Sequence, residues 1–280
     1  MNSELINVYS SFGPPALPLT YVISIIVIAL PLAAFIGFYV GRFEYRRREY
    51  EKNPPGQIPG GTSLGAMLAL LGLLLGFAFS SALGWREARQ AALVEEAMAI
   101  GTAFLTSDLL DDPGRTDLQQ SILFYAQTRL ATLADVRTEE SWNAFLSRTF
   151  NAQSEIWPTS LRALEGARSD PIRTTVARSV TEMLDAHTRR VAAATEQIPS
   201  TVKLMILLVA CVSVLIVGNR SALQGRKLTW RTFVFAGVLA VTMITISDLD
   251  RTLEGMIRIN PSTMLAAIYE METTLGSRSE

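Results

Sequence analysis

Long stretches without any charged side chain constrain this chain more than any other feature. They cover residues 5–41, 53–85, 204–219 and 232–247. The apolar core of a bilayer is about 30 Å thick, so a helix that crosses it needs about 20 predominantly apolar residues. Because 49% of the residues are hydrophobic and only 18% are charged, against about 25% in soluble domains, we predict an integral membrane protein with four transmembrane helices.

The predicted fold class is all-α, with a large extramembrane helical bundle between the second and third spans. Pro113 is the first proline after the start of span two, so one helix can run from the membrane into the bundle. In chain order we expect an N-terminal membrane pair at 1–85 with spans at about 19–40 and 64–85, the bundle at 86–199, a C-terminal membrane pair at 200–258 with spans at about 201–219 and 230–248, and an amphipathic tail at 259–280.

Positive charges in the two short loops predict how the chain is oriented. The first loop carries Arg42, Arg46, Arg47, Arg48 and Lys52, and the second carries Arg220, Arg226, Lys227 and Arg231. Short loops rich in Lys and Arg remain in the cytoplasm. We therefore expect both termini and the helical bundle on the periplasmic side of a bacterial inner (cytoplasmic) membrane.

Small residues recur every three or four positions along the second span, at Gly65, Ala69, Gly72, Gly76 and Ser80. Such a stripe lets helix backbones approach closely and favours a homo-oligomer. Two interpretations remain open: the stripe serves only helix packing, or several copies of this helix line a pore. The residues near the constriction of such a pore would be Gly76, Phe77, Ser80, Ser81 and Gly84.

Charged residues follow the second span directly and recur after the fourth. A carboxylate inside a helical bundle needs a cationic partner, because burying an unpaired charge is costly. Either these residues form an ion-pair layer that holds the bundle to the membrane domain, or they attract ions in a vestibule. The residues concerned are Glu95 and Glu96, with Arg86, Arg89, Arg251 and Arg258 as the expected partners.

Three carboxylates near the end of the fourth span, Asp248, Asp250 and Glu254, lie on roughly one side of a helix and could bind calcium or another cation. Ion pairing with the nearby arginines is the competing interpretation. No other cofactor is expected. The single cysteine, Cys211, and the single histidine, His187, exclude a disulfide framework, a Cys/His zinc site and a Cys–His nucleophile pair.

The chain is not expected to be an enzyme or to bind nucleic acid. The sequence contains no nucleophile elbow, His-Glu-x-x-His helix or phosphate-binding glycine loop. Its formal net charge of −1 offers no general attraction for a polyanion. The expected partners are therefore the lipid bilayer and further copies of the chain.

Three stretches resemble a bacterial family of four-span membrane proteins with a bestrophin-like domain, distantly similar to the bestrophin ion channels. They are LLLGFAFS at 73–80 with EAR at 87–89, VEEAMAIGTAFL at 94–105, and DLDR at 248–251 with EGMIR at 254–258. The resemblance implies a pentameric channel lined by span two, with an anion such as chloride or bicarbonate favoured over a cation. It places Phe77 and Ser80 in the neck, and Asp248 and Asp250 near a calcium site. The alternative is a non-conducting scaffold or sensor whose helical region binds a protein partner.

Overall fold

The computed structural model describes residues 17–50, 61–130, 132, 135, 138–251 and 255–279. Every regular element within these residues is a helix, which confirms the all-α prediction. The elements are α2 (Leu19–Tyr50), α3 (Gly61–Thr106), the 3-10 turn η1 (Ser107–Leu109), α4 (Gly114–Thr128), α5 (Glu139–Glu165), α6 (Asp170–Thr195), α7 (Ser200–Leu223), α8 (Trp230–Leu249) and α9 (Ser262–Ser279).

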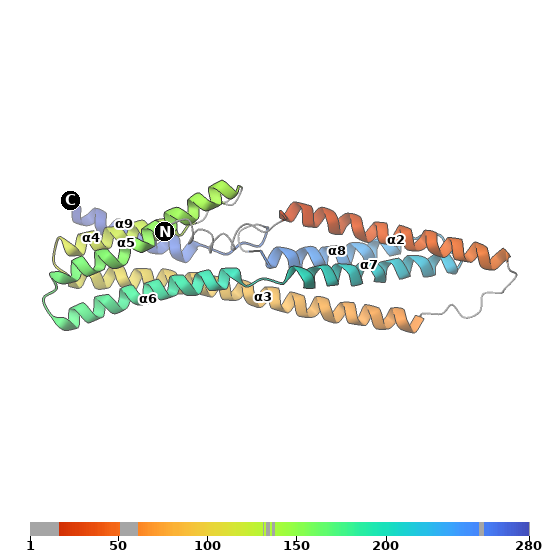
Figure 1. The fold of residues 1–280 in the computed structure, drawn as a ribbon, viewed down its shortest axis with the longest axis horizontal. Helices are drawn as coiled ribbons and strands as arrows, with labels where there is room; N and C mark the ends of the chain where they lie inside the picture. Colours follow the sequence, from red (N-terminus) through yellow and green to blue (C-terminus); the bar gives the residue numbers. More distant parts are fainter. Residues whose placement is uncertain are drawn as a thin grey trace.

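The helices form two bundles arranged end to end, so the molecule is elongated (Figure 1). One bundle contains α2, α7, α8 and the first half of α3, and the other contains α4, α5, α6, α9 and the second half of α3. Helix α3 has 46 residues, which corresponds to about 70 Å. It is the continuous helix that the proline-free sequence predicts, and it connects the two ends of the molecule.

Four helical stretches are long and apolar enough to cross a membrane, as predicted. They are Leu19–Arg47, Leu64–Leu109, Asp170–Leu223 and Trp230–Leu249. Pro31 lies inside α2 without ending it. Large apolar side chains such as Ile28 on α2 and Val241 on α8 point outward and are exposed, as expected of helices that face lipid.

Helices α2 and α7 pack backbone against backbone at three glycines. A Cβ atom on Gly37 would overlap the carbonyl group of Leu215, and one on Gly218 would overlap the carbonyl oxygen of Ala34. Gly41 approaches the Asn219 carbonyl in the same way. Small residues allow the backbones of two membrane helices to approach this closely. The stripe of small residues predicted close packing on α3, and the contact between α2 and α7 was not predicted.

Each bundle has its own hydrophobic core, and α3 contributes to both. Leu71 and Leu75 are buried with residues of α2, α7 and α8, whereas Ile100 and Phe104 are buried with residues of α4, α5 and α6. The predicted amphipathic tail forms α9, and its Met264 belongs to the second core. Apolar packing therefore fixes α3 at both of its ends.

Candidate functional site

The five predicted pore residues lie on one exposed side of α3. Gly76, Ser80, Ser81 and Gly84 are exposed, and Phe77 is 65% exposed. A Cβ atom on Gly76 or Gly84 would meet no atom within 4 Å. Among the residues that the structure describes, no helix of the same chain covers this part of the small-residue stripe. The packing interpretation therefore requires lipid or another copy of the chain.

This uncovered surface continues along α3 beyond the predicted span. Glu87, Glu95, Met98 and Leu105 are exposed on the second half of the helix. They are eight, three and seven residues apart, which puts their side chains on the same side of the helix. We call the exposed side of α3 from Gly65 to Leu105 the α3 face. It extends through both bundles.

Arg89 connects three segments of the chain at the junction between the bundles. It is 2% exposed. Its guanidinium group donates hydrogen bonds to the carbonyl oxygens of Glu196 (2.9 Å), Asp250 (3.1 Å) and Leu249 (3.4 Å). The first lies between α6 and α7 and the others end α8, so Arg89 ties both segments to the middle of α3. This arrangement supports the interpretation of a layer that holds the two bundles together.

The segment after α8 is attached to α3 in the same region. Arg86 donates to the carbonyl oxygen of Arg258 at 3.5 Å. The side-chain amide of Gln90 exchanges two hydrogen bonds with the backbone of Asn260, at 2.8 and 3.1 Å. Arg251 donates to the carbonyl oxygen of Leu17 at 2.6 Å. The arginines named from the sequence thus reach backbone oxygens of the chain segments that flank the membrane helices.

Asp248 is 1% exposed and stabilises the backbone just after α8. Its carboxylate accepts hydrogen bonds from the backbone N–H groups of Met256 (2.9 Å) and Ile257 (3.0 Å). Gly255, with φ +114°, makes this turn possible, and a Cβ atom there would overlap the carboxylate of Asp248. The carboxylate therefore serves as a cap for a tight turn.

Asp250 is equally buried, and the structure gives both of its oxygens a protein partner. Oδ1 accepts a hydrogen bond from the backbone N–H of Ile198 at 2.8 Å, and Oδ2 lies 2.5 Å from Nζ of Lys203. The third predicted ligand, Glu254, lies outside the described residues. Within the described ranges, no group of three side chains suited to a metal ion occurs. Asp250 is thus ion-paired, with Lys203, whereas Asp248 binds backbone N–H groups, and the cation site stays a prediction.

Glu96 is the centre of a buried polar cluster that joins α3, α4 and α6. It is 0% exposed, and its Oε1 accepts from Tyr125 Oη (2.7 Å) and Arg129 Nε (2.8 Å). Its Oε2 accepts from Arg190 Nη1 at 2.5 Å. His187 Nδ1 lies 3.0 Å from Tyr125 Oη and 3.5 Å from Glu96 Oε1. The cluster thus holds one carboxylate against two guanidinium groups.

Burial and charge shift the ionisation of these groups in definite directions. Burial by itself would raise the pKa of Glu96, but Arg129, Arg190 and the hydrogen bonds hold that pKa well below its ordinary value. Burial lowers the pKa of His187 and, with the charge of Glu96, raises that of Tyr125 well above its ordinary value. At neutral pH the cluster therefore contains a carboxylate, two guanidinium groups, a neutral imidazole and a phenol.

The sequence identified Glu95 and Glu96 as carboxylates that need partners, but the expected partners, Arg86, Arg89, Arg251 and Arg258, were wrong. Glu95 forms a half-exposed ion pair with Arg189 at 2.9 Å, and Glu96 pairs with Arg129 and Arg190. Arg189 and Arg190, which are adjacent on α6, were the feature of the sequence that could have indicated these partners. Their distance from Glu96 along the chain, more than 90 residues for Arg190, gave no indication of contact.

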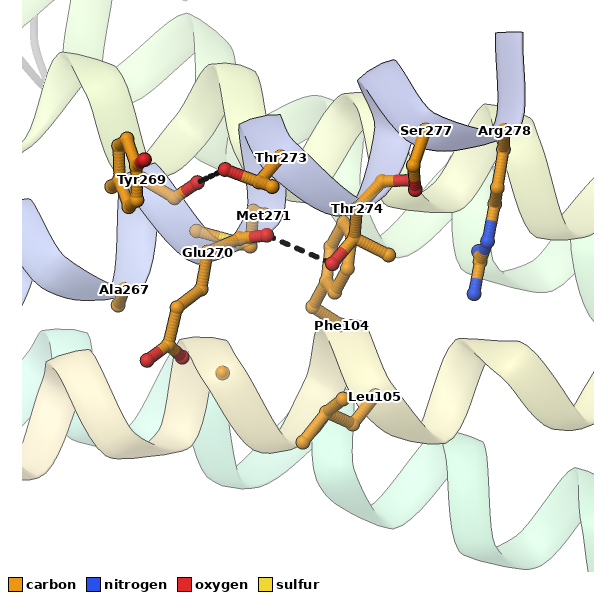
Figure 2. A pocket seen from close by; sticks show the side chains of 11 residues that line it. Phe104, Leu105, Ala267, Tyr269, Glu270, Met271, Thr273, Thr274, Ser277 and Arg278 are labelled. Carbon is orange, nitrogen blue, oxygen red and sulfur yellow. Dashed lines mark hydrogen bonds between the residues drawn. The ribbon is translucent and has the colours of Figure 1, made fainter. Parts of the chain in front are cut away.

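A groove of about 560 Å³ lies along the contact between the second half of α3 and α9. Figure 2 shows the side chain of Glu270 pointing from α9 toward α3, with Phe104 and Leu105 on the opposite wall. Arg278 lies at one end of the groove and pairs with Asp108 at 2.8 Å. The groove is bordered by the α3 face, so the two features are continuous.

A family model of the Bestrophin-like domain matches residues 28–264. The chain belongs to the Bestrophin-like family. Its four apolar helices and this membership identify an integral membrane protein. No protein of curated function matches the chain significantly.

The fold is similar to crystal structures of a bacterial bestrophin homologue from Klebsiella pneumoniae. One mutant gives a TM-score of 0.62 at 15% identity, over 90% of this chain and 96% of that chain. A second mutant gives 0.61 at 15% identity, over 89% and 99%. The structure phased with zinc gives 0.60 at 15% identity, over 88% and 96%. At this identity the likeness demonstrates a shared fold.

Proposed function

We propose that the protein is an oligomeric ion channel of the bestrophin-like type, in which copies of α3 surround the ion pathway. The observation that carries the proposal is the composition of the α3 face. The exposed sides of α2 and α8 present large apolar residues such as Ile28 and Val241. The exposed side of α3 also carries large residues such as Leu73 and Phe77, but among them runs a row of small residues that includes Gly76, Ser80 and Gly84. Small and polar side chains suit contact with a neighbouring helix or with water better than contact with lipid.

The proposal places a constriction at Phe77. This side chain projects from the α3 face beside two small residues on the next turn, Ser80 and Ser81, so in a ring of α3 helices it would narrow the pathway. Hydrophobic constrictions gate other channels by excluding water. By analogy with bestrophins we propose a pentamer, and we assign conduction rather than catalysis.

The bundle of α4, α5, α6 and α9 is proposed to lie outside the membrane. Its surface carries exposed ion pairs, such as Arg168 with Asp111 and Arg178 with Glu182. Charged side chains on a lipid-facing surface are costly, which supports an aqueous location. The positive loops support a location of this bundle and both termini in the periplasm of a bacterial inner membrane, and we propose the domain boundaries predicted from the sequence.

The resemblance favours an anion such as chloride or bicarbonate over a cation. Arg86 and Glu87 lie two and three residues after Gly84, and the charges of such residues at the end of a pathway influence selectivity. With Glu87 exposed on the α3 face, a Glu87→Gln variant should increase the preference for anions. The reversal potential under a chloride gradient measures this change.

A non-conducting scaffold or sensor is the second candidate, and the groove between α3 and α9 favours it. This groove, with the carboxylate of Glu270 in it, offers a surface to a helix or peptide of a partner protein. A scaffold would bind its partner through the bundle and would show no flux in liposomes.

The two candidates are separated by ion flux through purified protein in liposomes. A Phe77→Ala variant should increase conductance or change selectivity, because it removes the side chain that narrows the pathway. Ile28→Ala is the control, since Ile28 is an equally exposed apolar side chain, at 63%, that lies on α2 and outside the α3 face. Currents that respond equally to both substitutions would contradict the proposed constriction. Complete absence of flux in the unaltered protein would favour the scaffold.

A further inference from the structure

Basic side chains are concentrated at the end of the membrane helices that lies away from the second bundle. Helix α2 continues beyond its apolar part to Tyr50 and exposes Arg42 and Arg46. The segment from α7 to α8 exposes Arg226, Lys227 and Arg231. We call these five residues the basic surface. Glu44 is an acidic residue that lies among them.

The fold brings these two segments together, although nearly 180 residues separate them in the chain. Gly225 adopts φ +66° in the turn after α7, and a Cβ atom on it would lie 3.6 Å from the hydroxyl oxygen of Tyr45. One turn of helix earlier, Gly41 packs directly on the Asn219 backbone. Arg226 and Lys227 therefore lie beside the basic end of α2 and form one surface with it.

Exposed aromatic residues mark the level of this surface in the membrane. Trp230 is 70% exposed at the start of α8, and Tyr39 and Phe43 are exposed to a similar extent on α2. Tryptophan and tyrosine concentrate at the boundary between the apolar bilayer core and the headgroups. The basic side chains lie next to these aromatics, and their flexible stems allow the charges to reach the headgroup layer.

We propose that the basic surface binds the headgroups of anionic phospholipids. A guanidinium group matches a phosphate with two parallel N–H donors, and several basic residues on one surface can hold more than one headgroup. If the basic side chains served only to orient the chain in the membrane, they would not need to bind one class of lipid in preference to another. Side chains that the fold gathers from two distant segments beside interfacial aromatics have the arrangement of a lipid-binding surface. The inference depends on the chain lying in a membrane and does not depend on ion conduction.

The test measures lipids that remain bound to the full-length protein. Protein in detergent is mixed with phosphatidylglycerol or phosphatidylcholine, and bound lipid is counted by native mass spectrometry. We expect preferential binding of phosphatidylglycerol. A triple variant, Arg46→Gln with Arg226→Gln and Lys227→Gln, should weaken that binding at least tenfold, since each basic residue at an anionic surface changes affinity by roughly fivefold.

The matched control removes the same number of charges from the second bundle. Arg148→Gln, Arg173→Gln and Arg178→Gln replace exposed arginines there, and this variant should bind phosphatidylglycerol within twofold of the unaltered protein. Equal losses in the two variants, unchanged binding in the first, or no preference over phosphatidylcholine would each overturn the proposal. Unchanged circular dichroism and elution volume verify that the variants are folded. Flux measured in phosphatidylcholine liposomes separates a failure of this inference from a failure of the proposed channel.

Discussion

Replacing Glu96 with glutamine should strongly destabilise the second bundle. The substitution preserves the shape of the side chain but removes the carboxylate that pairs with both Arg129 and Arg190. The side chain of Arg129 is 9% exposed and that of Arg190 is 21% exposed, so neither is freely hydrated once Glu96 is neutral. Removing one partner of a buried ion pair costs about 3–5 kcal/mol.

Glu95→Gln is the control, because it makes the same chemical change at the adjacent residue. Glu95 pairs with Arg189, and both side chains are about half exposed, at 48% and 52%. Exposed ion pairs contribute about 0–1 kcal/mol. Thermal unfolding followed by circular dichroism should therefore show a fall in Tm on the order of 10 °C for Glu96→Gln and at most about 3 °C for Glu95→Gln. Equal falls in Tm would refute the reasoning, because it rests on the difference in burial.

Three further predictions follow from particular contacts. Burial lowers the pKa of His187 below 6.5, so the unfolded chain binds its proton more readily; stability should fall as pH drops below 6.5, and His187→Gln should reduce that fall in a denaturation series across pH. Gly218→Val should prevent the close contact of α2 with α7 and cost about 3 kcal/mol. Gly72→Val should leave the fold of the monomer intact, and resistance to proteolysis compares the two variants. A Ser169→Cys variant that also carries Cys211→Ser should react with a membrane-impermeant thiol reagent in intact cells; protection would contradict the periplasmic orientation.

Much of the fold follows from the distribution of charge along the chain. Stretches without charge had to be helices, because a single membrane-crossing segment must satisfy its backbone hydrogen bonds internally. The continuity of α3 followed from the absence of proline between its membrane part and Pro113. Both inferences depend on properties of one segment at a time, which a sequence reveals directly.

Contacts between segments that are distant in the chain were harder to predict from the sequence. The stripe on α3 indicated a face of small residues but not what covers it, and within the described part of the chain nothing lies against Gly72 or Gly76. The close contact instead involves Gly37 and Gly218 on α2 and α7. Likewise, Glu96 was identified as a carboxylate in need of a partner, while the choice of Arg190 depends on the angle at which α6 crosses α3. Helix crossings are set by the packing of whole surfaces and not by local spacing.

The mass of the purified protein with its lipids retained tests the central claim most directly. If copies of α3 enclose an ion pathway, native mass spectrometry should find a ring of several 30.7 kDa chains, five by analogy with bestrophins. Cross-linking in the membrane before extraction should give the same number. A stable monomer or dimer in both measurements would contradict the account, because one or two α3 helices cannot surround a pore.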